Sequence, residues 1–342
     1  MNRAHRLVVA AGAVVVLGGS VVVAGCSSTD SQPVTTTSIA ASSASPMATP
    51  SSAETPTPRP QATDPLTGGA VNNRGVIAVK VENIAAARPQ VGLSQADITF
   101  IQEVEGAQTR LIAVYHSRFP KRLGPIRSAR STDVQLLPLF GRPGLVYSGA
   151  NSSVQRKIDR ASIVPIPRST RDRSRAAPHN VFVDLAAIAE SSKLPAATSI
   201  GWTFDGAVPR ASQATPRQAQ GAASVKVRVG RDTFSFGYSS DRYTVRWNGS
   251  RYADGDNGTI TKTDNVVIMS VRNHPDGNRD VLGAPSVQSD TVRKGAVIIY
   301  RDGRKIVGQW KRAKVSAPLR FTDKSGESIA LKPGQTWVAL AG

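Results

Sequence analysis

The sequence holds a single cysteine, Cys26, in 342 residues. One cysteine excludes an intramolecular disulfide and any metal cluster built from several thiolates. Histidine is nearly as scarce, with four residues, and their wide spacing gives no signal of a zinc site. The GxSxG, HExxH and GxxxxGK motifs are also absent. No single motif therefore assigns a catalytic mechanism, a metal or a cofactor.

Acidic residues are the second shortage, with 24 Asp and Glu against 43 Lys and Arg and a net charge of +19. The charges of residues 1–66 cancel, so the whole excess lies in residues 67–342. A basic surface of this kind favours polyanions. Because no nucleic-acid-binding motif is present, the prediction is an anionic partner other than nucleic acid.

The N-terminus has the pattern of a secretory signal. Arg3 and Arg6 precede an apolar run over residues 7–23. The run ends in VAGC, which resembles the bacterial lipobox. We therefore expect residues 1–25 to be a lipoprotein signal peptide and Cys26 to be lipidated. This anchors the chain to a bacterial membrane, at the outer face of the cytoplasmic membrane. The alternative is an uncleaved transmembrane anchor, and both place the remainder outside the cytoplasm.

Composition divides the rest of the chain into three segments. Residues 26–66 are rich in Ser, Thr and Pro. Such a segment buries too little apolar surface to offset the conformational entropy lost on folding, so a disordered tether is predicted. Strands alternating with helices predict an α/β N-terminal domain over residues 67–215, with a mixed sheet and flanking helices. Short β-rich runs separated by turn signals predict a smaller, mainly antiparallel β C-terminal domain over residues 216–342.

Hydrophobic patterning places the individual elements. Asp184 is a candidate N-cap for the last helix of the first domain, Ser131 or Thr132 for the first helix, and Pro138 should distort that first helix. In the second domain, the segment around His274 has the composition of a turn. Strands are expected over residues 75–81, 97–104, 110–116, 144–148 and 181–183, and helices over 133–140, 152–160 and 185–193.

Several long segments, in order, resemble the YerB-like family of bacterial lipoproteins, whose two halves are domains of unknown function. In the first half these are residues 79–117, GPIRSAR (124–130) and RAAPHN (175–180). In the second half they are DNVVIMSV (264–271) and the segment that begins RDGRKIVGQWKR at residue 301. The resemblance implies a lipid-anchored, two-domain extracytoplasmic protein and supplies no activity.

An arginine concentration lies between residues 118 and 175, where thirteen basic residues face three acidic ones. Arginine grips carboxylate and phosphate in two-point contacts. Within GPIRSAR, Arg127, Ser128 and Arg130 form a candidate anion site before a helix. The loop RDRSRAAPHN adds Arg171, Arg173 and Arg175 to the candidate anion-binding residues. The alternative is a solvated basic face without a specific ligand.

A second constellation combines Glu103, Glu105, Arg110 and His116. If this stretch is a strand, the carboxylates of Glu103 and Glu105 lie on the same face. Two such carboxylates could act as general acid and base on a glycan, or they could bind a hard cation such as calcium. The alternative is a set of structural ion pairs, with Arg110 pairing one of the carboxylates. Arg110 is also a candidate ligand for anions.

The loop before residue 181 supplies the candidate for proton transfer, His179, because histidine titrates near neutral pH. Asn180 and Asp133 are additional polar candidates.

Three classes of function remain. The first is a non-enzymatic protein that binds an anionic wall polymer, glycan or lipid headgroup. The second is an envelope hydrolase or transferase that uses Glu103 or Glu105 with His179. A third reading is a scaffold for another envelope protein, with Trp247, Trp310 and Trp337 as anchors. The sequence names no protein partner, and no cofactor is expected.

Overall fold

The computed structural model describes residues 63–206, 223–280 and 283–342. All described residues belong to one compact unit. The predicted signal peptide, Cys26 and nearly all of the predicted tether lie outside the described residues, as does the predicted boundary at residue 215. No helix of the described part is long and apolar enough to span a bilayer.

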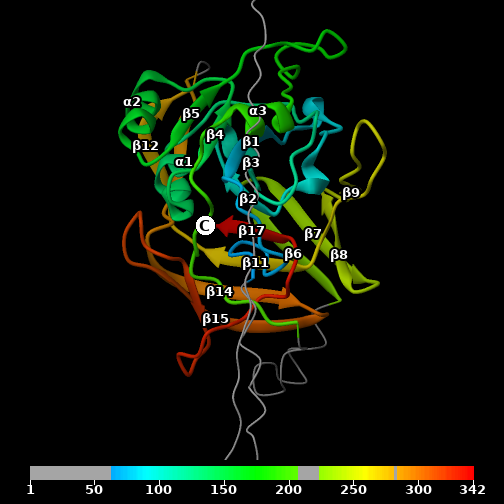
Figure 1. Ribbon diagram of the computed structural model, residues 1–342, viewed down its shortest axis with the longest axis vertical. Helices are drawn as coiled ribbons and strands as arrows, with labels where there is room; N and C mark the ends of the chain where they lie inside the picture. The colour runs from blue at the N-terminus through cyan, green and yellow to red at the C-terminus, as the bar shows by residue number, and fades with distance from the viewer. Residues whose placement is uncertain (1–62, 207–222, 281–282) are drawn as a thin grey trace, which may run out of the picture. The chain divides into compact units, whose positions relative to one another are not determined.

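A ten-stranded sheet runs through the described unit (Figure 1). Strands from both halves of the chain form it, because β17 pairs in parallel with β11 on one side and with β2 on the other. In order across the sheet the strands are β16 (Arg320–Thr322), β15 (Arg304–Arg312), β14 (Arg293–Arg301), β11 (Asn265–Ser270), β17 (Thr336–Ala341), β2 (Ile98–Glu103), β3 (Thr109–Tyr115), β1 (Ile77–Glu82), β4 (Gly144–Tyr147) and β5 (Val164–Pro167).

Two smaller antiparallel sheets come from the second half of the chain. Both are built from consecutive hairpins, in agreement with the predicted antiparallel β character of that half. The first contains β10 (Lys262–Thr263), β8 (Arg242–Trp247), β7 (Asp232–Ser239) and β6 (Ser224–Val229), with β9 (Ser250–Arg251) on β8. The second is the hairpin of β12 (Asn273–Arg279) and β13 (Pro285–Ser289). The predicted turn around His274 is therefore wrong, because this residue pairs with Gln288 inside β12.

Helices are few and short among the described residues. The α-helices are α1 (Ser131–Leu136), α2 (Ser152–Arg160) and α3 (Leu185–Ser191), and the 3-10 turns are η1 (Ala85–Ala87), η2 (Leu93–Gln95), η3 (Glu105–Ala107) and η4 (Leu137–Phe140). The predicted distortion at Pro138 is confirmed, because α1 ends at Leu136 and gives way to η4. The predicted cap at Asp184 is also confirmed: its carboxylate accepts a hydrogen bond from the Ala187 N–H.

Three other local predictions need correction. The N-cap of α1 is Arg130, one residue before the predicted caps, and the Asp133 carboxylate accepts the Arg130 N–H. Residues 181–183 form only isolated bridges, to Arg171 and Leu123. β5 was not predicted, because its sequence VPIP carries two prolines, which strands accept mainly at a sheet edge; β5 is the edge strand.

The central sheet lies between two hydrophobic cores. Alternate residues of one strand enter different clusters: Ala78 of β1 packs in the first and Val79 in the second. Helices α1 and α2 supply residues such as Leu136 and Ile158 to the first core. Helix α3 and strands β6–β8 supply the second, with Phe234 among them. Strands buried on both faces require apolar residues at successive positions, so they read as continuous hydrophobic runs.

Candidate functional site

A cleft of about 660 Å³ lies where β1 and β4 reach their carboxyl ends. Its lining residues include Glu82, Glu105, Arg110, Arg127, Ser128 and Asn151. The β4–α2–β5 segment is a parallel crossover, since β4 and β5 pair in parallel, and Asn151 is the N-cap of α2. In α/β sheets, crevices outside the carboxyl ends of strands are the usual place for ligands. Figure 1 shows α2 beside β5.

Backbone hydrogen bonds fix the GPIRSAR segment along the cleft. Its members bond to β1 on one side, through the Arg127 N–H and the Lys80 carbonyl, and to the end of β4 on the other, through the Ala129 N–H and the Gly149 carbonyl. Gly124 starts the segment, and a Cβ there would lie 2.7 Å from the Val181 carbonyl oxygen. Glycine is therefore required where the chain enters the cleft.

Arg130 and Glu105 form a closed ion pair in the cleft wall. The Arg130 guanidinium donates to both oxygens of Glu105 and to the Ala129 carbonyl, and the Ser286 hydroxyl donates to Glu105 at 2.5 Å. Burial opposes ionisation of Glu105, but the hydrogen bonds and charge of Arg130 prevail and bring its pKa to about 2. Glu105 is therefore a carboxylate at neutral pH and unsuited to donate a proton.

Arg110 has far fewer partners. Its side chain rises from β3 opposite Glu82 of β1, and the residue is only 9 % exposed. One guanidinium nitrogen lies 3.4 Å from the Ser128 carbonyl oxygen and another lies 3.7 Å from Glu105. Burial, together with the charge of Arg130, lowers its pKa to about 9. A buried guanidinium with so few acceptors is costly unless an anion joins it.

Arg127 and His179 share one carboxylate at the cleft. Glu82 is buried, and its two oxygens lie 2.9 Å from Arg127 Nε and 2.8 Å from His179 Nδ1. A carboxylate at Nδ1 orients an imidazole and leaves Nε2 to act on another group. Neither terminal nitrogen of Arg127 has a protein partner within the described ranges.

The loop arginines fall outside the cleft lining. Arg171 donates to the Asn180 side-chain oxygen at 2.7 Å. Arg175 donates to the carbonyls of Ala87 and Pro89. Arg173 is exposed. The thirteen basic residues therefore do not form one face. Some hold the loop in place, and two of them, Arg127 and Arg130, line the cleft. Arg130 is committed to Glu105, whereas the terminal nitrogens of Arg127 remain available.

The remaining candidates are structural in their contacts. His116 is buried against Asp64 at 2.8 Å. Asp133 pairs with Lys80 at 2.9 Å, with both side chains wholly buried. Glu103 accepts from the Asn273 side chain at 3.0 Å. The premise that Glu103 and Glu105 share a strand face is wrong, because β2 ends at Glu103 and Glu105 starts η3.

The three tryptophans proposed as anchors are covered by the protein itself. Trp310 and Trp337 are 2 % and 3 % exposed. Arg88 stacks on Trp247, with 4.0 Å between the guanidinium carbon and the ring centroid. Their indole rings therefore offer little surface to another protein.

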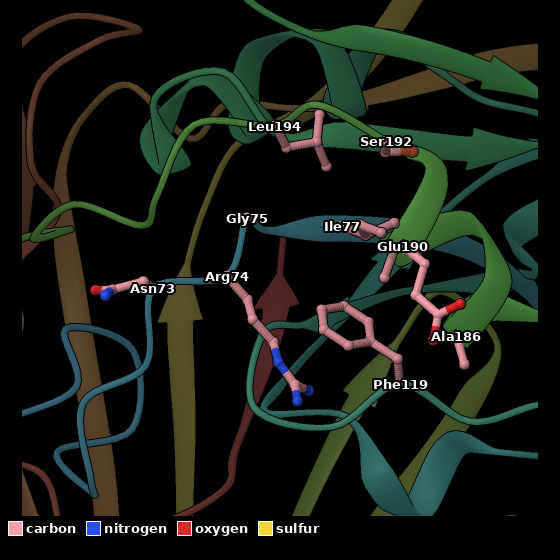
Figure 2. Close-up of a pocket in the computed structure, with 10 residues that line it drawn as sticks. Asn73, Arg74, Gly75, Ile77, Phe119, Ala186, Glu190, Ser192 and Leu194 are labelled. Atoms are coloured by element: carbon pink, nitrogen blue, oxygen red, sulfur yellow. The ribbon is translucent and has the colours of Figure 1, made fainter. Parts of the chain in front are cut away.

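A separate pocket of about 480 Å³ lies between the start of β1 and α3 (Figure 2). Its charged side chains are Arg74 and Glu190, and the guanidinium of Arg74 lies 5.5 Å from the Phe119 ring centroid. Figure 2 shows a largely aliphatic wall that includes Ile77 and Leu194. With one cation opposed by one carboxylate, this pocket has no preference for anions.

Sequence reasoning missed Glu82, Ser286 and the end of β4. Glu82 carried a signal, because a charged residue that closes an apolar strand needs a partner. Ser286 carried none, since it reaches the cleft from β13, 181 residues beyond Glu105. No group of three or more His, Cys, Asp or Glu side chains in the described residues is arranged to hold a metal ion.

The fold is a layered α/β structure in which one sheet carries a cleft lined by arginine and carboxylate side chains at its carboxyl edge. Comparisons place the chain in a family. Residues 63–197 match the N-terminal domain and residues 224–338 the C-terminal domain of a protein family of unknown function, DUF3048. The chain belongs to this family.

Two comparisons with Bacillus subtilis agree with that membership. The chain is 27 % identical over 297 residues to the "Putative lipoprotein YerB" of Bacillus subtilis strain 168. The matched region covers 81 % of this chain and 85 % of the relative. It is similar in fold to the crystal structure of YerB, with a TM-score of 0.67, 23 % identity, and coverage of 82 % of this chain and 96 % of that one.

Proposed function

We propose that the chain binds an anionic component of the cell envelope, a wall polymer, glycan or lipid headgroup, in the cleft between Arg110 and Arg127. The observation that carries this proposal is Arg110, a residue only 9 % exposed on the cleft wall, whose guanidinium makes one hydrogen bond of 3.4 Å. The carboxylate nearest to it already pairs with Arg130. An anionic ligand supplies the acceptors that the protein leaves out.

We propose also that Cys26 carries the lipid anchor and that the folded region lies outside the cytoplasm. The lipobox-like VAGC and the printed name of the Bacillus subtilis relative support this. Anionic wall polymers and lipid headgroups are the polyanions within reach of such a protein. The anchor and the cleft then serve one purpose, because tethering raises the local concentration of the ligand.

The test is a titration of the full chain in detergent with two soluble polyanions, polyphosphate and polygalacturonate, across a salt series. Binding is expected to weaken steeply with salt. The double variant Arg110→Met/Arg127→Ala should lose about a hundredfold or more in affinity, since each of the two charged hydrogen bonds contributes about 1.5–3 kcal/mol.

The matched control is Arg142→Ala/Arg173→Ala, which removes the same charge from two exposed residues outside the cleft lining. It should bind nearly as well as the unmodified chain. Equal losses of affinity in both variants would show that the polyanion binds a diffuse basic surface and not the cleft. An affinity that changes neither with salt nor in either variant would overturn the proposal.

A second candidate is a hydrolase or transferase that acts on the same polymer with His179 and Glu103 or Glu105. The pKa of Glu105, about 2, removes it as a proton donor, and neither Glu103 nor His179 is among the residues that line the cleft. What favours catalysis is the Glu82–His179 contact, in which a buried carboxylate orients the imidazole.

Catalysis is tested by incubating the full chain with poly(glycerol phosphate) and measuring the chain length of the polymer. If His179 is the base, His179→Asn abolishes cleavage and Glu82→Gln slows it about 100-fold or more, as loss of an orienting carboxylate does in serine proteases. An intact polymer after incubation with the unmodified chain would exclude this activity on that substrate.

A further inference from the structure

Free hydrogen-bond donors border the cleft from three directions. Arg110 comes from β3, and Arg127 and the Ser128 hydroxyl come from the GPIRSAR segment. The third source is the amino end of α2, where the Asn151 side chain caps the Val154 N–H. The N–H groups of Ser152 and Ser153 have no partner among the described residues.

Three carboxylates line the cleft, and each already has a partner; Asp280 accepts the Ala284 N–H. Glu105 accepts from Arg130 and Ser286, and Glu82 lies against Arg127 Nε and His179. The Ser128 carbonyl faces Arg110. The missing partner is therefore rich in acceptors and negatively charged, and it needs no donors of its own.

The arrangement discriminates between the anions that an envelope offers. A carboxylate presents two oxygens in one plane, whereas a phosphoryl group presents oxygens toward several directions. Arginine forks and the amino end of a nine-residue helix are both established partners of phosphate. Gly149 borders the same cleft, and a Cβ at this position would meet no atom within 4 Å. The backbone before α2 is therefore open to the cleft.

We propose that this part of the cleft is a phosphoryl-binding subsite, in which Arg110, Arg127, the Ser128 hydroxyl and the first N–H groups of α2 surround one phosphate group. This inference rests on the proposed anion binding and narrows its ligand to phosphate monoesters and diesters. The same chemistry is found in soluble wall polymers and in phospholipid headgroups.

The experiment measures calorimetric affinities of the full chain in detergent for inorganic phosphate and dimethyl phosphate, with malonate and acetate as carboxylates of similar charge. The phosphoryl probes should bind about tenfold tighter or more, as one additional charged hydrogen bond implies. Arg110→Met should remove this preference.

The backbone donor is tested by Ser152→Pro. Proline is well accepted at the first position of a helix, and it deletes one N–H without a new side-chain contact. Asn151 is already extended, with φ −68° and ψ 161°, as a residue before proline must be. Ser152→Pro should weaken phosphate binding about threefold to tenfold, while Ser152→Ala, which keeps the N–H, should not change it. An intact circular-dichroism spectrum of Ser152→Pro confirms that the helix is retained.

Each outcome separates the two proposals. Equal or tighter binding of the carboxylates would overturn the phosphoryl subsite and leave the anion cleft standing. An absence of binding by all four probes, and by the polyanions above, would overturn both. Equal affinities of Ser152→Pro and Ser152→Ala would remove α2 from the subsite and overturn the proposed arrangement.

The source of the phosphate is resolved by competition. Labelled poly(glycerol phosphate) bound to the chain is challenged with vesicles of phosphatidylglycerol and phosphatidylcholine in equal amounts, or of phosphatidylcholine alone. Displacement by the anionic vesicles alone supports the subsite and assigns it to lipid headgroups. Retention of the polymer against both vesicles supports the subsite and assigns it to wall polymer. If malonate displaces the polymer as readily as phosphate does, the proposed phosphoryl-binding subsite is overturned.

Discussion

Arg110 and Arg312 are both buried arginines, and they satisfy their donors in opposite ways. Arg312 is completely buried, and its five N–H groups reach five oxygens, four of them backbone carbonyls. Arg110 has one hydrogen bond of 3.4 Å and a carboxylate at 3.7 Å. Burial lowers the pKa of both side chains, to about 10 for Arg312 and about 9 for Arg110. Arg312 thus stabilises the fold, whereas Arg110 leaves donors for a ligand.

The largest effect is expected from Arg312→Met. The Arg312 side chain connects β15 to the last carbonyls of α1, at Gln135 and Leu136, so its loss leaves several buried carbonyls without a donor. The free energy of unfolding should fall by about 4–5 kcal/mol. Chemical denaturation measures this change, with Arg320→Met, at an exposed position of β16, as the control. A loss no greater than that of the control would contradict the role assigned to Arg312.

A slightly smaller loss is expected from Asp133→Asn. Lys80 and Asp133 are both 0 % exposed and 2.9 Å apart, and burial lowers the pKa of Lys80 to about 8 against the opposing charge of Asp133. Removing one partner of such a pair costs about 3–4 kcal/mol. The double variant Lys80→Met/Asp133→Leu should recover most of that loss, because apolar replacements remove both buried charges. Failure of the double variant to recover would show that the pair does more than cancel charge.

Arg110→Met tests the difference between Arg110 and Arg312, because this substitution should change the free energy of unfolding very little. Its buried charge has no dedicated acceptor, so an apolar side chain of similar length should change the free energy of unfolding by less than about 1 kcal/mol. The unmodified chain should gain thermal stability with added phosphate, and the variant should not. A destabilisation as large as that of Arg312→Met would mean that Arg110 is structural and would weaken the proposed function.

The difference between these arginines also marks what the sequence can predict. Strands β1 to β4 were located within a few residues, because buried strands leave long apolar runs such as IAVKV. The edge strand β5 was missed, and the strand predicted at residues 181–183 is absent. Arg127, Ser128 and Arg130 were found because GPIRSAR combines turn residues with arginines. Nothing local to the sequence distinguishes Arg130, which is committed to Glu105, from Arg110, which is not. That distinction depends on acceptors contributed by residues far along the chain.

The shared sheet illustrates the same limit at larger scale. Trp337 of β17 pairs with Thr99 of β2 across 238 residues, and such a parallel pairing has no local turn to announce it. The two halves read as separate domains because each has its own periodicity. In the structure the two halves are joined by backbone hydrogen bonds between β17 and β2. The sequence of one half alone does not predict this pairing.

The smallest effect concerns another buried side chain, His116, whose carboxylate partner is Asp64. Burial opposes the protonated imidazole, but the hydrogen bond and charge of Asp64 prevail and raise the pKa of His116. The same bond lowers the pKa of Asp64 against the effect of burial. The Asp97 carboxylate accepts a hydrogen bond from the backbone N–H of His116, and burial raises the pKa of the Asp97 carboxyl.

The sign of the resulting pH dependence follows from these directions. The contribution of His116 is complete below the unfolded value of about 6.5 and is lost as pH rises through the raised pKa. The contribution of Asp64 is complete above about 3.9 and is lost as pH falls through its lowered pKa. The stability difference between the unmodified chain and His116→Gln should therefore be largest between about pH 4 and 6.5 and should shrink toward alkaline pH. Denaturation of both proteins over that range measures it. A difference that stays constant with pH would show that folding does not change the pKa of His116, and it would contradict the charged contact between His116 and Asp64.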